Sequence, residues 1–218
     1  MIAILFMKEH SERLPNKNIK ILNGKPLFYW IFNTLSTLPH ISNIILNTDS
    51  NKIAELVKLY FPDTIIHFRP KYLLGNHIVA NELIEYELKN IYEGDHFLQT
   101  HVTNPLLSSS TIYNAINYYY NNLGKYDSLF AVTKYQGRFY FKNGKPVNHK
   151  TNIIEQTQKM KPIYEDNSCL YLFSRNSFKK NGRIGQKPKM FEINKLEAVD
   201  IDTEEDFILA ESLMKNGL

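Results

Sequence analysis

The stretch IAILFMKEHSERLPNKNIKILNGKP, which runs from Ile2 to Pro26, decides the fold. Its first part, Ile2 to Phe6, is a continuous apolar run, which is typical of a strand buried on both faces of a parallel sheet. A polar loop from Lys8 to Lys25 follows, and Pro26 then stands where proline often opens a helix. The stretch therefore predicts a strand, a loop and a helix, in that order.

The same order recurs along the first 135 residues and near the C-terminus. Strand-like segments are expected at 43–47, 64–68, 95–100, 127–133, 169–173 and 197–201, and apolar stripes at helical spacing at 27–38, 53–60, 79–91 and 109–120. Thr48-Asp49-Ser50 is expected to form a turn and a helix cap, and Thr203 is expected to cap a final helix with Asp206 at its third position. This alternation predicts an α/β fold, a Rossmann-like three-layer sandwich with a mostly parallel central sheet.

Residues 136–166 break the alternation. They are rich in Lys, Gly, Asn and Gln, with short strands at best, as at Arg138–Phe141. We expect a small protruding arm there, which is either a mobile flap or a segment that packs on a second subunit. The rest of the 218 residues is enough for one domain, so a single domain over 1–218 is expected.

Composition limits the kinds of partner. No apolar run reaches the roughly 18 residues that a membrane helix needs, so no membrane partner is expected. A net charge of +4 without a dense basic stripe argues against a nucleic-acid partner. The single cysteine, Cys169, lies in an apolar run, which suits inert core and a reducing cytoplasm.

A cationic loop follows the first expected strand and contains Lys8, Ser11, Arg13, Lys17 and Asn18. A triphosphate needs cationic side chains and amide donors that converge from a fixed backbone. The loop matches neither a Walker A sequence nor a GxGxxG fingerprint, so it is no ordinary P-loop. It is either a triphosphate site or a solvated basic loop.

Two further loops carry polar side chains after expected strands. His101, Thr103 and Asn104 follow a central strand, where they either hold a base or sugar hydroxyls or form a turn and helix cap. Asp200 and Asp202 are two residues apart, so in a strand both carboxylates would point the same way. One or two carboxylates commonly hold a divalent cation beside phosphates, and the alternative is a helix-capping cluster.

Together these stretches resemble the acylneuraminate cytidylyltransferase family, which includes the CMP-sialic acid synthetases. The resemblance covers nearly the whole chain, in order, at Ser11, Arg13, Leu14-Pro15, Lys17-Asn18, Asn23–Leu27, Thr48-Asp49-Ser50, Arg69-Pro70, Thr103–Leu106, Gln158, Asn167, Gly185–Pro188 and Val199–Phe207.

The resemblance implies transfer of CMP from CTP to the anomeric hydroxyl of an acidic, nonulosonate-type sugar, with release of pyrophosphate. It implies one or two Mg²⁺ ions at Asp200 and Asp202, and a cytoplasmic homodimer whose arm helps to build the neighbour's sugar pocket. Catalytic roles are implied for Lys8, Arg13, Lys17 and Asp202. Contacts to the nucleotide are implied for Lys8, Ser11, Arg13, Lys17, Asn18, Thr48, Asp49 and Arg69, the last of which could instead reach the sugar. Contacts to the sugar are implied for His101, Thr103, Asn104, Gln158 and Asn167.

The chain departs from the family pattern at several of these positions. An early arginine is Lys8, a lysine is Glu12, a glutamine is His101, an arginine is Leu107 and a glycine is Ser168. These changes leave the acceptor open, with 3-deoxy-manno-octulosonate, legionaminate, pseudaminate, a sugar phosphate or a phosphonate as alternatives. A nucleotide-sugar glycosyltransferase with an Asp-x-Asp site and a degenerate binding protein are rival functions.

Overall fold

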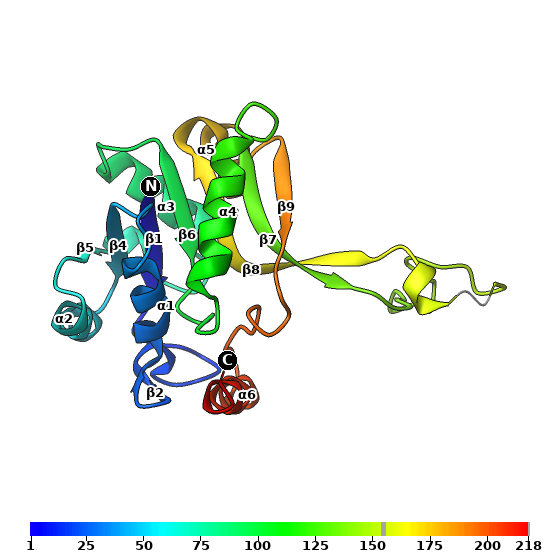
Figure 1. The fold of residues 1–218 in the computed structure, drawn as a ribbon. Coiled ribbons are helices and arrows are strands. Elements are labelled where there is room, and N and C mark those ends of the chain that lie inside the picture. The colour runs from blue at the N-terminus through cyan, green and yellow to red at the C-terminus, as the bar shows by residue number, and fades with distance from the viewer. Residues whose placement is uncertain (154–155, 218) are drawn as a thin grey trace.

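The central element is a seven-stranded sheet with strand order β5-β4-β1-β6-β8-β7-β9 (Figure 1). The computed structural model describes residues 1–153 and 156–217. The strands are β1 (Ile2–Met7), β4 (Asn43–Thr48), β5 (Ile65–Phe68), β6 (His96–Thr100), β7 (Ser128–Tyr135), β8 (Ile163–Ser174) and β9 (Pro188–Glu192). All neighbours are parallel except that β8 runs antiparallel to β6 and β7. The predicted mostly parallel sheet is therefore confirmed.

Helices cover both faces of this sheet, which gives the predicted three layers. On one face lie α1 (Leu27–Ser36), α2 (Asn51–Tyr60) and α4 (Ser109–Asn121), and on the other lie α3 (Ala80–Asn90) and α5 (Arg175–Asn181) (Figure 1). The last helix, α6 (Glu204–Lys215), packs its Phe207 and Ala210 with Leu14 and Leu22, so it covers the cationic loop rather than the sheet. Short 3₁₀ turns occur at η1 (Lys17–Ile19), η2 (Lys71–Leu73), η3 (Thr157–Lys159) and η4 (Gly182–Ile184), and β2 (Ile21–Leu22) pairs with β3 (Lys25–Pro26).

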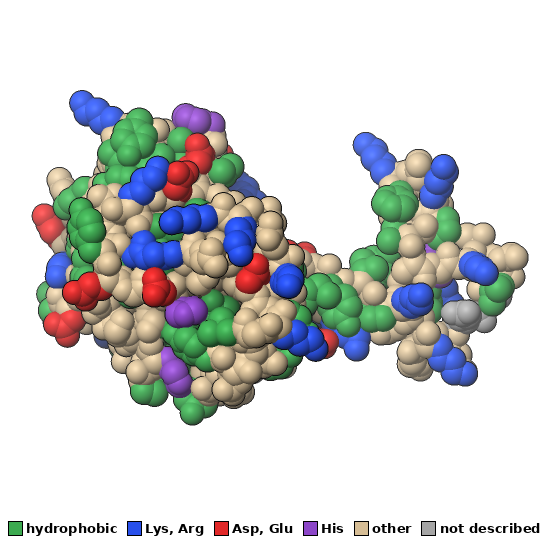
Figure 2. All heavy atoms as spheres, turned by 90° about the horizontal axis from the view of Figure 1, so that it is seen from above, with side chains coloured by type: hydrophobic (Ala, Val, Ile, Leu, Met, Phe, Trp, Pro, Cys, Tyr) green, Lys and Arg blue, Asp and Glu red, His purple; other side chains and the backbone are tan. Residues whose placement is uncertain are grey.

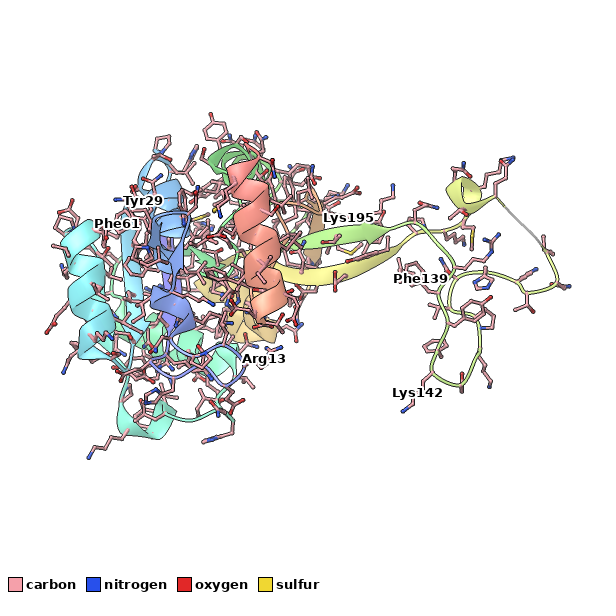
Figure 3. The ribbon with its side chains drawn as sticks, turned by 90° about the horizontal axis from the view of Figure 1, so that it is seen from below. Arg13, Tyr29, Phe61, Phe139, Lys142 and Lys195 are labelled. Carbon is pink, nitrogen blue, oxygen red and sulfur yellow. The ribbon has the colours of Figure 1, made fainter. Side chains whose placement is uncertain are left out.

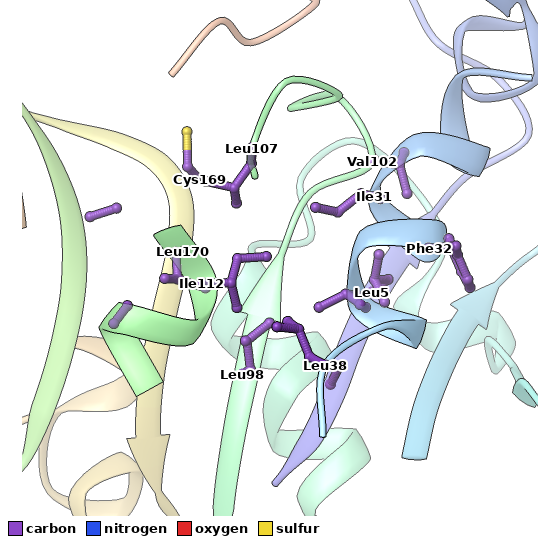
Figure 4. Close-up of a cluster of buried hydrophobic side chains, with 14 of the residues drawn as sticks. Leu5, Ile31, Phe32, Leu38, Leu98, Val102, Leu107, Ile112, Cys169 and Leu170 are labelled. Atoms are coloured by element: carbon purple, nitrogen blue, oxygen red, sulfur yellow. The ribbon is translucent and has the colours of Figure 1, made fainter. Parts of the chain in front are cut away.

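Buried apolar side chains join the first helical layer to the sheet. Leu5 and Leu98 of the sheet pack with Ile31 of α1 and Ile112 of α4 (Figure 4). Leu107 lies in the same cluster and is almost fully buried. The departure from the family pattern at Leu107 therefore falls in the hydrophobic core.

Local capping agrees with the sequence. The Ser50 hydroxyl accepts a hydrogen bond from the backbone N–H of Ile53 at the start of α2. Thr203 and Asp206 form a reciprocal capping box at the start of α6. Both helices therefore begin where the sequence predicts, because a side-chain oxygen satisfies a backbone donor there.

Two predicted strands are wrong. Residues 197–201 form no strand; the segment is held instead by Ile201, whose N–H donates to the Thr103 carbonyl at 2.8 Å. Arg138–Phe141 is not a strand either, and only Tyr140 forms an isolated bridge, with Pro146. The edge strand β9 and the short helix α5 were not predicted, because neither segment has a periodic apolar pattern long enough to identify it.

An arm projects from the body of the molecule. The ends of β7 and β8 leave the sheet together as a two-stranded ribbon, after a register irregularity between Phe130 and Val132. Residues 136–153 and 156–162 form its tip, which Figures 1 and 3 show well away from the body. The predicted arm, 136–166, also included 154–155, which lie outside the described residues.

The arm tip is basic and partly apolar at its surface. Lys and Arg side chains are spread over the face of the tip seen in Figure 2. They come from the cations of this segment, which are Arg138, Lys142, Lys145, Lys150, Lys159 and Lys161. Tyr140 and Phe141 are 54% and 58% exposed beside them. Among the described helices of the whole chain, none combines the length and the apolar character needed to cross a membrane.

Candidate active site

A cavity of about 340 Å³ opens where the loops after β1, β5 and β6 meet the segment before α6. The carboxyl ends of the parallel strands lie at this edge, which is where open α/β sheets bind ligands. The predicted residues that line the cavity are Lys8, Ser11, Arg13, Lys17, Asn18, Arg69, His101, Thr103, Asp200 and Asp202.

The cationic loop and the acidic pair meet directly at this cavity. Arg13 Nη2 lies 2.7 Å from Asp202 Oδ2, and Lys17 Nζ lies 2.8 Å from Asp202 Oδ1. Lys17 Nζ also donates to the Ile201 carbonyl at 2.8 Å. Residues more than 180 positions apart in sequence thus form one charged cluster, because α6 packs against the loop that carries both cations.

Asp200 is the buried member of the acidic pair. Its pKa is raised, first by burial and then by Asp202, while a hydrogen bond from the Thr103 side chain and the charge of Lys17 act in the opposite direction. Its Oδ1 is buried and accepts no hydrogen bond in the described part of the chain. A buried oxygen without a donor is costly, so this atom is suited to a bound cation.

The loop after η2 reaches across the mouth of the cavity. Lys8 Nζ donates to Asn76 Oδ1 at 2.8 Å, and Asn76 Nδ2 donates to Glu12. The acidic replacement at Glu12 therefore turns toward Asn76 and not toward Arg13. Asn76 was missed by the sequence analysis, because an asparagine in an irregular loop gives no pattern to detect.

A buried hydrogen-bond network fixes Arg69, whose guanidinium lines the cavity. Arg69 Nε donates to Asn47 Oδ1 at 2.8 Å, and Asn47 Nδ2 donates to Glu87 Oε1 at 2.7 Å. The other oxygen of Glu87 lies 2.5 Å from His67 Nδ1. Glu87 is fully buried, so its charge is compensated inside the protein by these partners. Within residues 1–153 and 156–217, the hydrogen bonds of this network engage Nε of Arg69 and neither terminal nitrogen.

Three of the residues predicted to contact substrates are not among the residues that line the cavity. Thr48 Oγ1 accepts from the N–H of Ser50, and Asp49 Oδ1 accepts from the N–H of Glu9 at 2.7 Å, so these two residues shape the loops behind the cavity. The Asn104 side chain donates to the Val199 carbonyl at 3.3 Å and helps to hold the acidic segment.

Asn167 and Gln158 lie outside the cavity lining. The buried Asn167 donates to Thr133 Oγ1 at 2.9 Å and accepts from the N–H of Cys169, so it supports the irregular pairing of β7 and β8. Gln158 is exposed on η3 in the arm tip, away from the body of its own chain (Figure 1). Ser168 has φ +58°, in the left-handed region that favours glycine, which explains the glycine of the family pattern at this position.

The class of protein follows from comparison with known proteins. A family model described as Cytidylyltransferase matches residues 2–217. The chain belongs to this cytidylyltransferase family, and it is a nucleotidyltransferase. The family match confirms the resemblance seen in the sequence and decides against a nucleotide-sugar glycosyltransferase.

Particular relatives and structures agree with this family. The chain is 24% identical to the post-translational flagellin modification protein B of Campylobacter coli, over 94% of this chain and 91% of the relative. It is 26% identical to the pseudaminic acid cytidylyltransferase of Campylobacter jejuni, over 98% and 96% of the two chains. Among solved structures, CMP:2-keto-3-deoxy-manno-octonic acid synthetase in complex with CTP has a TM-score of 0.73 at 10% identity, covering 100% of this chain and 99% of that one. The chain spans about half the length of several other curated relatives it matches.

Proposed function

We propose that this chain transfers CMP from CTP to the anomeric hydroxyl of an acidic, nonulosonate-type sugar and releases pyrophosphate. The observation that carries the proposal is the contact of Arg13 and Lys17 with Asp202 at one cavity. Cations for a polyphosphate and carboxylates for a metal are thereby placed side by side. The names of relatives such as the pseudaminic acid cytidylyltransferase support this class of acceptor.

The chemistry is an in-line displacement at the α-phosphorus of CTP. The sugar hydroxyl oxygen forms the new bond to phosphorus while the bond to pyrophosphate breaks, and the hydroxyl proton leaves to solvent. Lys8, Arg13 and Lys17 neutralise the triphosphate and the departing pyrophosphate. Catalysis then rests on positioning and electrostatic stabilisation by these side chains.

Asp200 and Asp202 would hold magnesium. The fit rests on the buried, unpartnered Oδ1 of Asp200 and on the second carboxylate at the same cavity. When bound, the ion would lower the negative charge on the reacting phosphates. Within the described residues no group of three or more His, Cys, Asp or Glu side chains could hold a metal, so the phosphates and water would complete the coordination.

The direct test is a screen with CTP, magnesium and a panel of acidic sugars, with pyrophosphate release as the readout. We expect turnover with at least one nonulosonic acid and none with ATP or GTP. Turnover with 3-deoxy-manno-octulosonate or a sugar phosphate alone would keep the reaction class and replace the acceptor. Binding of CTP without turnover for any acceptor would identify a degenerate binding protein.

Lys17→Met is expected to weaken CTP binding. A charge-assisted hydrogen bond contributes about 1.5–3 kcal/mol, which corresponds to roughly a 10- to 100-fold rise in Kd. Isothermal titration calorimetry with CTP measures it. The matched control is Lys20→Met, because Lys20 pairs with Glu204 and lies outside the cavity lining. Equal affinity of the two variants would make Lys17 a purely structural residue.

The arm is proposed to join two copies of this chain into a homodimer and to bring Gln158 to the neighbour's sugar pocket. The support for this role is the basic tip of the arm, where Tyr140 and Phe141 are exposed to solvent in the single chain. We expect light scattering at micromolar concentration to give twice the 25.5 kDa of the chain, and Phe141→Asp to shift the mass toward one copy. A monomeric wild-type protein would contradict this role. We also propose that the enzyme works in the cytoplasm.

A further inference from the structure

His101 lies at the end of β6, where the cavity meets the face of the sheet that α3 covers. Gln99, two residues earlier on the same strand, is fully buried on that face. Arg183, in η4, approaches Gln99 from the loop after α5, and its backbone N–H donates to Asn81 Oδ1 of α3. Three polar side chains from two distant segments thus form a row that ends at the cavity.

The guanidinium of Arg183 has a fixed orientation. Its Nη1 donates to Gln99 Oε1 at 2.7 Å, and its central carbon lies 3.7 Å from the centroid of the Tyr171 ring. The Tyr171 hydroxyl in turn donates to Asp166 Oδ1 at 2.7 Å. Stacking on a buried ring that is itself hydrogen-bonded leaves Arg183 little freedom to move.

The donors and acceptors along this row allow one arrangement. Arginine only donates, so the Gln99 oxygen must face Arg183 and the Gln99 amide nitrogen must face the other way. That nitrogen donates to the Thr100 carbonyl at 3.2 Å and lies 3.0 Å from His101 Nε2. His101 Nε2 must therefore accept, and in a neutral imidazole the proton is then on Nδ1.

We propose that Arg183 and Gln99 are positioning residues that hold His101 as a neutral imidazole with its proton on Nδ1, where it donates a hydrogen bond to an oxygen of the acceptor sugar. The inference rests on the proposed function for the identity of the ligand. It adds two residues that act through His101, and it states that His101 is the hydrogen-bond donor and the sugar oxygen the acceptor.

The charges around His101 agree with a neutral ring. The pKa of His101 is lowered to about 4, first by burial and then by the positive charges of Arg183 in η4 and Lys17 in the first loop. Asp166 of β8 and Asp202 before α6 oppose this effect, and they are the smaller contributions. A second ring proton would also bring an N–H of His101 against an N–H of Gln99, which no hydrogen bond could relieve.

A neutral donor suits an acceptor that carries its own negative charge elsewhere. The contact keeps the same strength over the whole range in which an ordinary histidine gains a proton. An amide would supply the same uncharged N–H, so His101→Gln is the conservative variant that should keep the contact.

Nuclear magnetic resonance of ¹⁵N-labelled histidine side chains tests the proposal in the protein without substrates. The signals of His101 are assigned by their loss in His101→Gln. We expect the wild-type ring to show a protonated Nδ1 and an unprotonated Nε2, with no titration between about pH 5.5 and 8. A protonated Nε2, or a titration near the ordinary histidine value, would overturn the proposal.

Two variants separate the roles. In Gln99→Glu a carboxylate replaces the amide, so Nε2 of His101 gains a proton and the ring titrates at least about one pH unit higher, a tenfold change in proton affinity. In Arg183→Met the Gln99 amide is free to turn over, and a mixture of the two His101 tautomers is expected. An unchanged tautomer in Arg183→Met would remove Arg183 from this role, even if the buried Gln99→Glu variant failed to fold.

Kinetics with the acceptor that the screen identifies provides the second readout. Gln99→Glu is expected to raise the KM for the acceptor about tenfold and to leave the KM for CTP unchanged. An equal change in both KM values would contradict a role in acceptor binding. The resonance measurement needs no turnover, so an inactive protein would refute the proposed function without altering the result for His101.

Discussion

Replacing Asp202 with Asn is expected to lower kcat by at least about 10²- to 10³-fold, with the fold retained. Within the described residues, Asp202 is the one side chain that forms ion pairs with both Arg13 and Lys17, at 2.7 and 2.8 Å. The substitution removes the negative charge that aligns these two cations and one of the two carboxylates proposed for the metal. Pre-steady-state measurement of pyrophosphate release separates this loss in the chemical step from a loss of CTP affinity.

The fold should survive because the side chain of Asp202 is 33% exposed and its ion pairs are near the surface. Pairs of that kind contribute about 0–1 kcal/mol to stability. The matched control is Glu204→Gln, two residues later, where the same charge is lost from a side chain that pairs with Lys20 outside the cavity. Turnover of Asp202→Asn close to that of this control would exclude Asp202 from the chemistry.

Glu87→Ala is expected to lower the free energy of unfolding by about 3–5 kcal/mol, because two buried hydrogen bonds to a carboxylate, each contributing about 1.5–3 kcal/mol, are lost. Glu87 is fully buried and holds both Asn47 and His67. The substitution leaves an amide donor and an imidazole without a partner and opens a cavity between α3 and the sheet. Urea denaturation followed by circular dichroism measures the change.

Glu85→Ala is the control for this prediction, because it makes the same substitution on the same helix at an exposed position that pairs with Lys89. Its effect should stay within about 0.5 kcal/mol. In the fraction of Glu87→Ala that folds, Arg69 loses the support of Asn47, so the KM for CTP should also rise. Equal stability losses in the two variants would show that the network around Glu87 contributes nothing beyond helix propensity.

The fold could be predicted because its signals are local. Ile2 to Phe6 identifies a buried strand from composition alone, and Ser50 and Thr203 mark helix starts through hydrogen bonds to residues three positions away. The failures at 197–201 and at β9 have a common cause. Whether an extended segment joins a sheet depends on a free neighbouring edge, and no local pattern in either segment reports that.

The candidate site was predictable only in part, for a related reason. The cations of the first loop and the acidic pair stand out by charge and by their resemblance to a family. Asn76, Gln99 and Arg183 acquire their roles through partners 64 to 84 positions away, so their own surroundings in the sequence are unremarkable in charge and pattern. Thr48, Asp49 and Asn167 show the converse, since they match the family pattern but support loops and strands outside the cavity lining.

The sequence by itself determined six of the seven strands of the sheet, the helix starts at Ser50 and Thr203, the arm and, through its resemblance to a family, the reaction class. Apolar periodicity, caps and motif spacing act over a few residues, so they can be read locally. Only the tertiary structure decided that Lys17 touches Asp202, that Leu107 is core, and that Arg183 reaches His101 through Gln99. These contacts arise when α6, η4 and the strand ends are packed together. Their geometry depends on the whole sheet, which no single segment encodes.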